Sequence, residues 1–102
     1  MSRIEKLRQM LDADPKDAFV LYGIAQEHAK TGDHAGAVGY YDRCLAADPN
    51  YTYAYYHKAV SQIESGQREQ AVETIKTGLA VAKSVKDGKA LNELTTLLDQ
   101  IT

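Results

Sequence analysis

The chain has 102 residues, of which 44% are hydrophobic and 25% charged, a composition typical of one soluble globular domain rather than a disordered segment. Its formal net charge of −2 provides no broad basic field, which argues against nucleic-acid binding through phosphate contacts. Cys44 is the single cysteine, so no disulfide can form within the chain. With no secretory signal or membrane span evident, we expect a cytoplasmic protein that acts away from membranes.

Residues 2–13 form the first predicted helix. Ser2 can cap its N-terminus, with Glu5 three residues later as in a capping box. One face of this helix carries the apolar side chains of Ile4, Leu7, Met10 and Leu11. The following Asp14-Pro15 pair is expected to end the helix, because the residue before a proline is disfavoured in helical conformation.

Residues 18–51 carry a helix–turn–helix pattern that residues 52–85 repeat at an offset of 34 residues. The predicted helices span 16–30, 34–47, 51–64 and 68–83, with Gly32 and Gly66 at the two bends. A fixed period of this length predicts helix pairs that bury their apolar faces against neighbouring pairs. The two copies are identical at Tyr22/Tyr56, Ala25/Ala59, Gly32/Gly66, Ala37/Ala71, Val38/Val72, Leu45/Leu79 and Ala46/Ala80.

A known repeat pattern accounts for these positions. The first copy supplies Leu21, Ile24, Ala25, His28, Ala37, Tyr41 and Pro49, and the second supplies Tyr55, Lys58, Ala59, Gln62, Ala71 and Ile75. These residues resemble the tetratricopeptide repeat (TPR) family, as a small bacterial-type protein or domain. The resemblance implies an all-α, right-handed solenoid of antiparallel helix pairs with six helices. Within one domain of residues 1–102, it implies a half-repeat helix at 2–15, repeat 1 at 18–51, repeat 2 at 52–85 and a capping helix at 88–101.

Two stretches depart from the pattern. Lys58 occupies a position where the family has leucine, so its stem is expected to lie along the core with the ammonium group reaching water. A final helix is predicted over residues 89–101, but strict continuation of the period would bury Lys89, Asn92, Glu93 and Thr96. A two-residue insertion instead places Leu91, Leu94, Thr95 and Leu98 in the core, and leaves Leu97 and Ile101 to pack elsewhere or be exposed.

No catalytic signature is present in the chain. It contains no nucleophile motif, no glycine-rich phosphate loop and no histidine or cysteine spacing suited to zinc. We therefore expect no enzymatic activity, no cofactor and no metal. His28 is expected to be a packed core side chain, His34 and His57 to face solvent, and Cys44 to be a buried, inert thiol.

The tyrosines indicate where a partner could bind, since they make up seven of the eight aromatic residues. In TPR proteins, the first helix of each pair lines a concave surface through positions two, five, nine and twelve of the repeat. Such a surface rich in tyrosine implies a groove for a protein or peptide partner. The residues expected to bind this partner are Phe19, Tyr22, Gln26, Tyr53, Tyr56, His57, Val60 and Ile63.

Three other interpretations bear on this groove. The aromatic side chains could simply pack against one another, or the terminal helices could join two copies into a homodimer through Leu97 and Ile101. The family's carboxylate clamp, which binds acidic C-termini, would map onto Tyr22, Gln26, His57, Lys89 and Glu93. Only Lys89 agrees with that clamp, and Glu93 would repel a carboxylate, so acidic tails are not expected as ligands.

Overall fold

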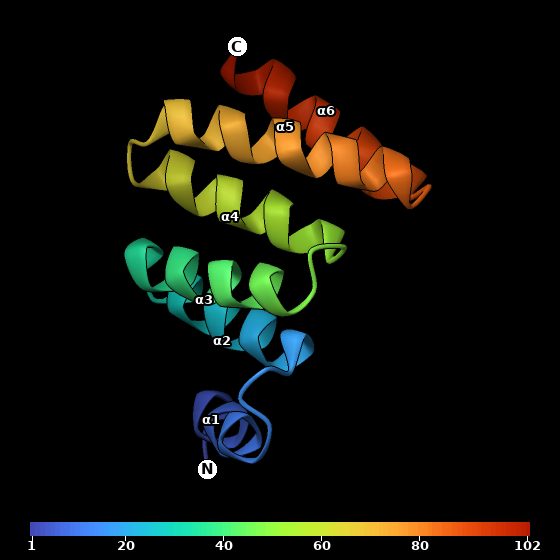
Figure 1. The fold of residues 1–102 in the computed structure, drawn as a ribbon. Helices are drawn as coiled ribbons and strands as arrows, with labels where there is room; N and C mark the ends of the chain where they lie inside the picture. Colours follow the sequence, from blue (N-terminus) through green and yellow to red (C-terminus); the bar gives the residue numbers. More distant parts are fainter.

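The computed structural model describes all 102 residues as six α-helices with no strand (Figure 1). The helices begin and end within one or two residues of the predicted bounds. Every one of them is too short or too polar to cross a lipid bilayer. The helices are α1 (Arg3–Ala13), α2 (Ala18–Lys30), α3 (His34–Ala47), α4 (Thr52–Glu64), α5 (Arg68–Ser84) and α6 (Gly88–Ile101).

Side-chain caps start four of the helices. The Ser2 hydroxyl accepts a hydrogen bond from the Glu5 N–H at 3.2 Å, as the capping pattern predicts. Asp17, Asp33 and Asp87 cap α2, α3 and α6 in the same way, through the amides of Val20, Gly36 and Ala90. Helices α4 and α5 begin without a side-chain cap, so they depend more on packing.

The helices end in two different ways. Helices α1 and α3 stop at an aspartate in extended conformation, directly before Pro15 and Pro49. Helices α2, α4 and α5 instead end with a residue in the left-handed region: Gly32 at φ 83°, Gly66 at φ 76° and Lys86 at φ 61°. The turn from α5 to α6 is therefore of the same kind as the turns inside the two helix pairs.

The helices stack in chain order, with α1 at one end and α6 at the other (Figure 1). Helices α2 and α3 form one pair, α4 and α5 form the next, and α3 packs against α4 to join them. Helix α4 also contacts α2 and α6, so these three helices lie in one row. Helix α1 is seen nearly end-on in Figure 1 and packs against α2.

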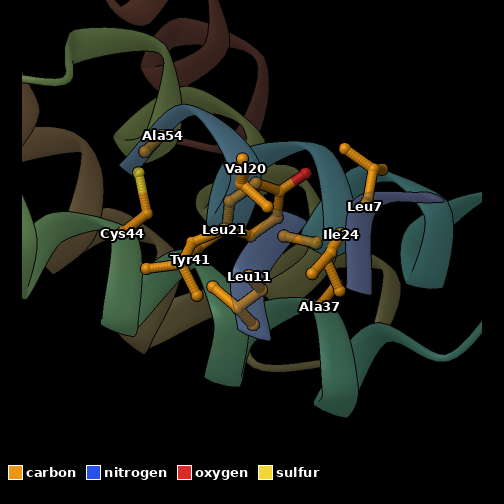
Figure 2. Packing of buried hydrophobic residues seen from close by; sticks show 10 residues of the cluster. Leu7, Leu11, Val20, Leu21, Ile24, Ala37, Tyr41, Cys44 and Ala54 are labelled. Carbon is orange, nitrogen blue, oxygen red and sulfur yellow. The ribbon is translucent and has the colours of Figure 1, made fainter. Parts of the chain in front are cut away.

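The core consists of two clusters of buried hydrophobic side chains. The first lies among α1, α2, α3 and the start of α4, as Figure 2 shows for Leu7, Leu11, Tyr41 and Cys44. The second lies among α4, α5 and α6 and contains Ala59, Ala71, Ile75, Ala82, Ala90, Leu94, Leu97 and Ile101. Each cluster spans adjacent helices, as expected for a stack in which every unit covers its neighbour.

Small residues allow the close approach of helices in both clusters. A Cβ atom added at Gly78 would lie only 2.7 Å from the Cβ of Tyr55, so α5 could not stay this close to α4 with a larger residue there. Cys44 occupies the same place in the preceding pair and is fully buried. The Tyr55 hydroxyl donates to the Pro49 carbonyl at 2.8 Å, which satisfies its polar end.

The predicted register of α6 was wrong by one residue. Ala90, Leu94, Leu97 and Ile101 are buried, whereas Thr95, which was expected in the core, is exposed. The buried Tyr55, Ala59 and Gln62 of α4 thus correspond to Ala90, Leu94 and Leu97, one residue beyond the 34-residue period. Leu97 and Ile101 therefore have an intramolecular role and do not supply the exposed contacts that the dimer interpretation requires.

The lysine at position 58 behaves as predicted from its long stem. Its side chain is 22% exposed, and its Nζ lies 2.7 Å from Oδ1 of Asp42 on α3. The ammonium group thus leaves the core and pairs with a carboxylate on the neighbouring helix. This ion pair crosses the joint between the two helix pairs.

Candidate functional site

Two adjoining hollows lie along the row formed by α2, α4 and α6. The first, of about 430 Å³, is lined by Arg3, Gln26, Glu27, Ala29, Lys30, Tyr41 and His57. The second, of about 490 Å³, lies between α4 and α6 and is lined by Tyr53, Tyr56, His57, Lys89, Asn92, Glu93, Thr96, Leu97 and Gln100. Because His57 lines both, we treat the two hollows as one surface and call it the inner groove.

His57 does not face solvent as predicted, because it is half-buried and aromatic rings surround it on three sides. Its ring stacks on that of Tyr41 at 6.4 Å between centroids, and meets the rings of Tyr22 and Tyr56 edge-on at 5.7 and 5.2 Å. The Tyr22 ring also packs against Tyr41 and, at 4.8 Å, against Tyr51. These contacts fix the ring positions, so the floor of the inner groove is formed without a partner.

Burial changes the ionisation of this cluster. Desolvation, with a smaller effect from Tyr51, raises the pKa of Tyr22 to about 12. Desolvation lowers the pKa of His57 below its usual 6.5, although the Glu93 carboxylate opposes this shift. At neutral pH the hydroxyl of Tyr22 is therefore protonated and the imidazole of His57 is neutral.

The predicted binding residues fall into two groups. Gln26, Tyr53, Tyr56 and His57 line the inner groove. Tyr22, Val60 and Ile63 are half-buried and pack against the two hydrophobic clusters. Tyr22 touches the groove only indirectly, through His57 and through its hydroxyl, which accepts a hydrogen bond from Nε2 of Gln26 at 3.2 Å. Phe19 is 64% exposed and lines neither hollow.

The alternative interpretation, in which the aromatic residues pack against one another, therefore holds for Tyr22 and Tyr41. Tyr53 and Tyr56 also contact the second cluster, but they line the open hollow between α4 and α6. The same tyrosines therefore stabilise the stack and shape its surface.

Helix α6 supplies groove residues that sequence reasoning did not select. Lys89, Asn92, Glu93, Thr96 and Gln100 form a polar stripe at helical spacing on one face of this helix. That spacing is visible in the sequence, but the predicted insertion of two residues, where the structure has one, assigned the wrong face of α6 to the core. The groove is consequently aromatic on α4 and polar on α6.

The charges of the two hollows are arranged differently. In the first, Glu27 pairs with Nε of Arg3 at 3.4 Å and with Nζ of Lys30 at 3.0 Å. In the second, Glu93 is half-buried and belongs to none of the four ion pairs within the chain. Lys89 lies one turn before it on α6 but does not reach ion-pair distance. Glu93 is therefore an uncompensated carboxylate inside the groove.

The other two histidines differ from their predicted environments. His28 is not in the core: its Nδ1 lies 2.9 Å from Asp33 Oδ2 and its ring stacks on Tyr40 at 5.2 Å. His34 is half-buried rather than solvent-facing, with its Nδ1 3.3 Å from the Ser61 hydroxyl. Both lie outside the inner groove and join neighbouring helices.

The remaining chemical prediction concerned Cys44. It is fully buried, and desolvation, followed by the Asp48 carboxylate, raises the pKa of its thiol to about 12. The predicted burial of this cysteine is thereby confirmed, and its inert character stays a prediction that the raised pKa supports. No three histidine, cysteine, aspartate or glutamate side chains are grouped as metal ligands would be.

The arrangement can now be compared with known proteins. Residues 28–98, well over half of the chain, match the sequence profile of the family described as Tetratricopeptide repeat. The chain belongs to the TPR family. TPR repeat-containing protein PA0015 from Pseudomonas aeruginosa is 26% identical over 98 residues, which cover 96% of this chain and 93% of that protein. Protein FlbA from Caulobacter vibrioides is 26% identical over 84 residues, 82% of this chain, but the chain spans only 14% of FlbA.

Solved TPR structures show the same architecture. A TPR domain protein from Salinibacter ruber is 30% identical, with a TM-score of 0.79 over 86% of this chain and 89% of that one. The TPR2B domain of yeast Sti1, solved in a complex with pHsp70, has a TM-score of 0.91 at 24% identity, covering 96% of this chain and 78% of that one. TPR folds generally mediate protein–protein interaction and are generally not catalytic, which leaves the partner and the contact surface to be inferred from the groove.

Proposed function

We propose that this TPR chain binds a segment of a partner protein in the inner groove, without catalysing a reaction. The observation that carries this proposal is the pair of adjoining hollows, about 430 and 490 Å³, that share His57 and run across α2, α4 and α6. A groove of this form accommodates several consecutive side chains of a peptide, whether extended or helical.

The aromatic wall favours binding because its rings are already fixed. Tyr53 and Tyr56 offer large contact areas with few rotatable bonds, and His57 is immobilised by Tyr41 and Tyr22. Little conformational entropy remains to be lost when a partner covers these rings, so more of the contact energy contributes to affinity. The polar stripe of α6 supplies hydrogen-bonding groups that set the orientation of the bound segment.

The comparisons support the class of ligand. The yeast Sti1 domain, which matches most of this chain in fold, is described in a complex with pHsp70, so a stack of these dimensions can hold another protein. The identity of the partner does not transfer at 24% identity. What this chain binds follows from its own groove residues.

A peptide selection tests the proposal directly. Phage displaying random 12-residue peptides would be selected on the intact chain, and the enriched peptides titrated against it by calorimetry. We expect Tyr56→Ala combined with Asn92→Ala to weaken these peptides by about tenfold or more, because both residues line the hollow between α4 and α6. Tyr22→Ala is unsuitable for this purpose, since the Tyr22 ring packs against the first cluster.

The matched control is Lys76→Ala combined with Thr77→Ala on α5, where both residues are exposed and outside the inner groove. This control should bind the peptides like the unmodified chain. Backbone amide shifts in NMR titrations should change at Tyr56, His57 and Asn92. Shift changes confined to other surfaces, or equal affinities for both double variants, would exclude the inner groove as the binding site.

A further inference from the structure

We propose that the bound segment contributes a lysine or arginine side chain, which inserts between α4 and α6 and pairs with Glu93 beside the rings of Tyr53 and Tyr56. This inference rests on the proposed function, because it specifies the chemistry of the ligand in the same groove. A basic side chain of this kind is the opposite of the acidic tails that a carboxylate clamp binds. Three features of the hollow between α4 and α6 lead to it.

The first feature is the uncompensated charge of Glu93. The Glu93 side chain lines the hollow and is half-buried, yet no lysine, arginine or histidine lies within ion-pair distance of it. His57, the basic residue of α4 that lines the same hollow, is kept neutral at pH 7 by burial. A partner that covers the groove would desolvate this carboxylate further, which is unfavourable unless the partner brings a positive charge.

The second feature is an incompletely satisfied hydroxyl in the same hollow. The Tyr53 hydroxyl oxygen is screened from solvent and has no partner at full hydrogen-bonding geometry. The Glu93 carboxylate is its neighbour: burial, then a weak hydrogen bond to this carboxylate and its negative charge, raise the pKa of Tyr53. An ammonium group has three N–H donors and a guanidinium has five, enough to serve both the Glu93 carboxylate and the Tyr53 oxygen.

The third feature is the aromatic lining. The rings of Tyr53 and Tyr56 line the same hollow as Glu93, and aromatic faces attract cations through their quadrupole. The hollow of about 490 Å³ is large enough for a long basic side chain. A carboxylate of the partner would meet the charge of Glu93, and a purely apolar side chain would leave that charge without a counterion.

Lys89 is the only positive side chain that lines this hollow. It is exposed and one helical turn from Glu93, so it can move into solvent when a ligand cation arrives. The arrangement therefore does not prevent a second positive charge from entering.

The test uses the peptides selected on the intact chain. The most strongly enriched peptide would be synthesised in its original form and with each lysine replaced by norleucine or each arginine by citrulline, which are neutral and of similar size. Both forms would be titrated against the unmodified chain, Glu93→Gln and Asp99→Asn. Asp99 is the matched control, because it is an exposed carboxylate on the same helix outside the inner groove.

The expected result is an interaction between two specific charges. The neutral peptide should bind the unmodified chain at least tenfold more weakly than the original, and Glu93→Gln should remove this difference, whereas Asp99→Asn should preserve it. Circular dichroism would establish that each variant is folded. The comparison of the two peptides on the unmodified chain tests the charge requirement even if Glu93→Gln is unstable.

Two other outcomes would overturn the inference, and they can be told apart. If the peptides shift groove resonances but lack a basic residue, or bind Glu93→Gln and Asp99→Asn equally, the groove binds a partner without this charge requirement. If no selected peptide shifts the groove resonances, both the charge requirement and the proposed function are wrong.

Discussion

At the scale of single residues, His57 connects the packing of the stack to the inner groove. It is in contact with aromatic rings from α2, α3 and α4, and its imidazole lines both hollows of the inner groove. Burial keeps the imidazole neutral, so its protonation couples the stability of the stack to pH.

We predict that the chain loses stability as the pH falls below about 6.5, and that His57 is responsible for part of this loss. The pKa of His57 is lowered in the folded state, so below 6.5 the unfolded chain binds more protons than the folded one. The contribution is complete above the unfolded pKa and declines as the pH falls towards the folded pKa. For one group the slope cannot exceed about 1.4 kcal/mol per pH unit.

Urea unfolding at pH 7.5, 6.5 and 5.5 measures this effect against His57→Phe, which keeps an aromatic ring. The difference in unfolding free energy between the two proteins should change with pH in favour of the variant. The capping carboxylates of Asp33 and Asp87 have lowered pKa values and so remain ionised throughout this range. A difference that stays constant from pH 7.5 to 5.5 would contradict the prediction.

Gly78 provides a second prediction at this scale. Gly78→Ala should reduce the unfolding free energy by about 1–3 kcal/mol, because the new methyl group would lie 2.7 Å from the Cβ of Tyr55 and force α5 away from α4. Gly39→Ala on α3 is the matched control, since no atom lies within 4 Å of its added Cβ. It should be stabilising by about 0.5–1 kcal/mol through helix propensity. Thermal unfolding followed by circular dichroism distinguishes the two, and equal effects would exclude the steric explanation.

At the scale of the elements, helix ends decide how the chain turns. An Asp-Pro pair leads the chain from one pair to the next, while a left-handed residue reverses it within a pair. The connection from α5 to α6 uses the second kind, with Lys86 as the only non-glycine residue at positive φ. A side chain in this conformation strains the backbone.

Replacing Lys86 by glycine should relieve that strain. We expect Lys86→Gly to raise the unfolding free energy by up to about 1 kcal/mol, the relief being partly offset by the greater freedom of glycine in the unfolded chain. The reverse change, Gly66→Lys, should lower it by about 1 kcal/mol at the equivalent turn. Urea titrations of both variants provide the measurement. Destabilisation by Lys86→Gly would show that the lysine side chain makes a stabilising contact at this turn.

The residues at the helix ends explain which helix bounds could be predicted from the sequence. Proline and glycine mark the ends of α1 to α4, so their bounds could be predicted closely. At the end of α5 neither residue is present, and α5 extends to 17 residues where α3 has 14. The shift of register in α6 depends on this extension and on a left-handed lysine, a conformation that sequence preferences do not favour.

At the scale of the whole molecule, the two hydrophobic clusters give a graded stability. Helix α1 packs mainly on α2 and reaches α3 only through side chains such as Arg8, whereas α4 contacts α2, α3, α5 and α6. We therefore predict that amide hydrogens in α1 exchange with solvent faster than those in α4, because opening α1 exposes only one edge of the first cluster. Hydrogen exchange followed by mass spectrometry on peptides from both helices measures this. Equal protection would show that the stack unfolds only as a unit.

The inner groove could be predicted only in part, because the repeat pattern fixes the face of a helix but not how each side chain on that face packs. The repeat pattern locates Tyr53, Tyr56 and His57 on the inner row because it fixes the face of α4. It does not distinguish Tyr22, which packs inward, from Tyr56, since both occupy the same position of the repeat. That difference arises from Tyr51 and Tyr41, which pack on Tyr22 and are not identical in the second copy.

Contacts between helices that are close in the sequence also affect how such a chain can change in length. Apart from the row of α2, α4 and α6, each helix packs on the one before or after it. A tandem duplication of residues 52–85 would therefore add one more layer of the same form. At the new joint the copied Lys58 would face Lys76, which stands one period after Asp42, so a second change would be needed to restore the ion pair found between α3 and α4. Each added layer would extend the groove by one more row of side chains.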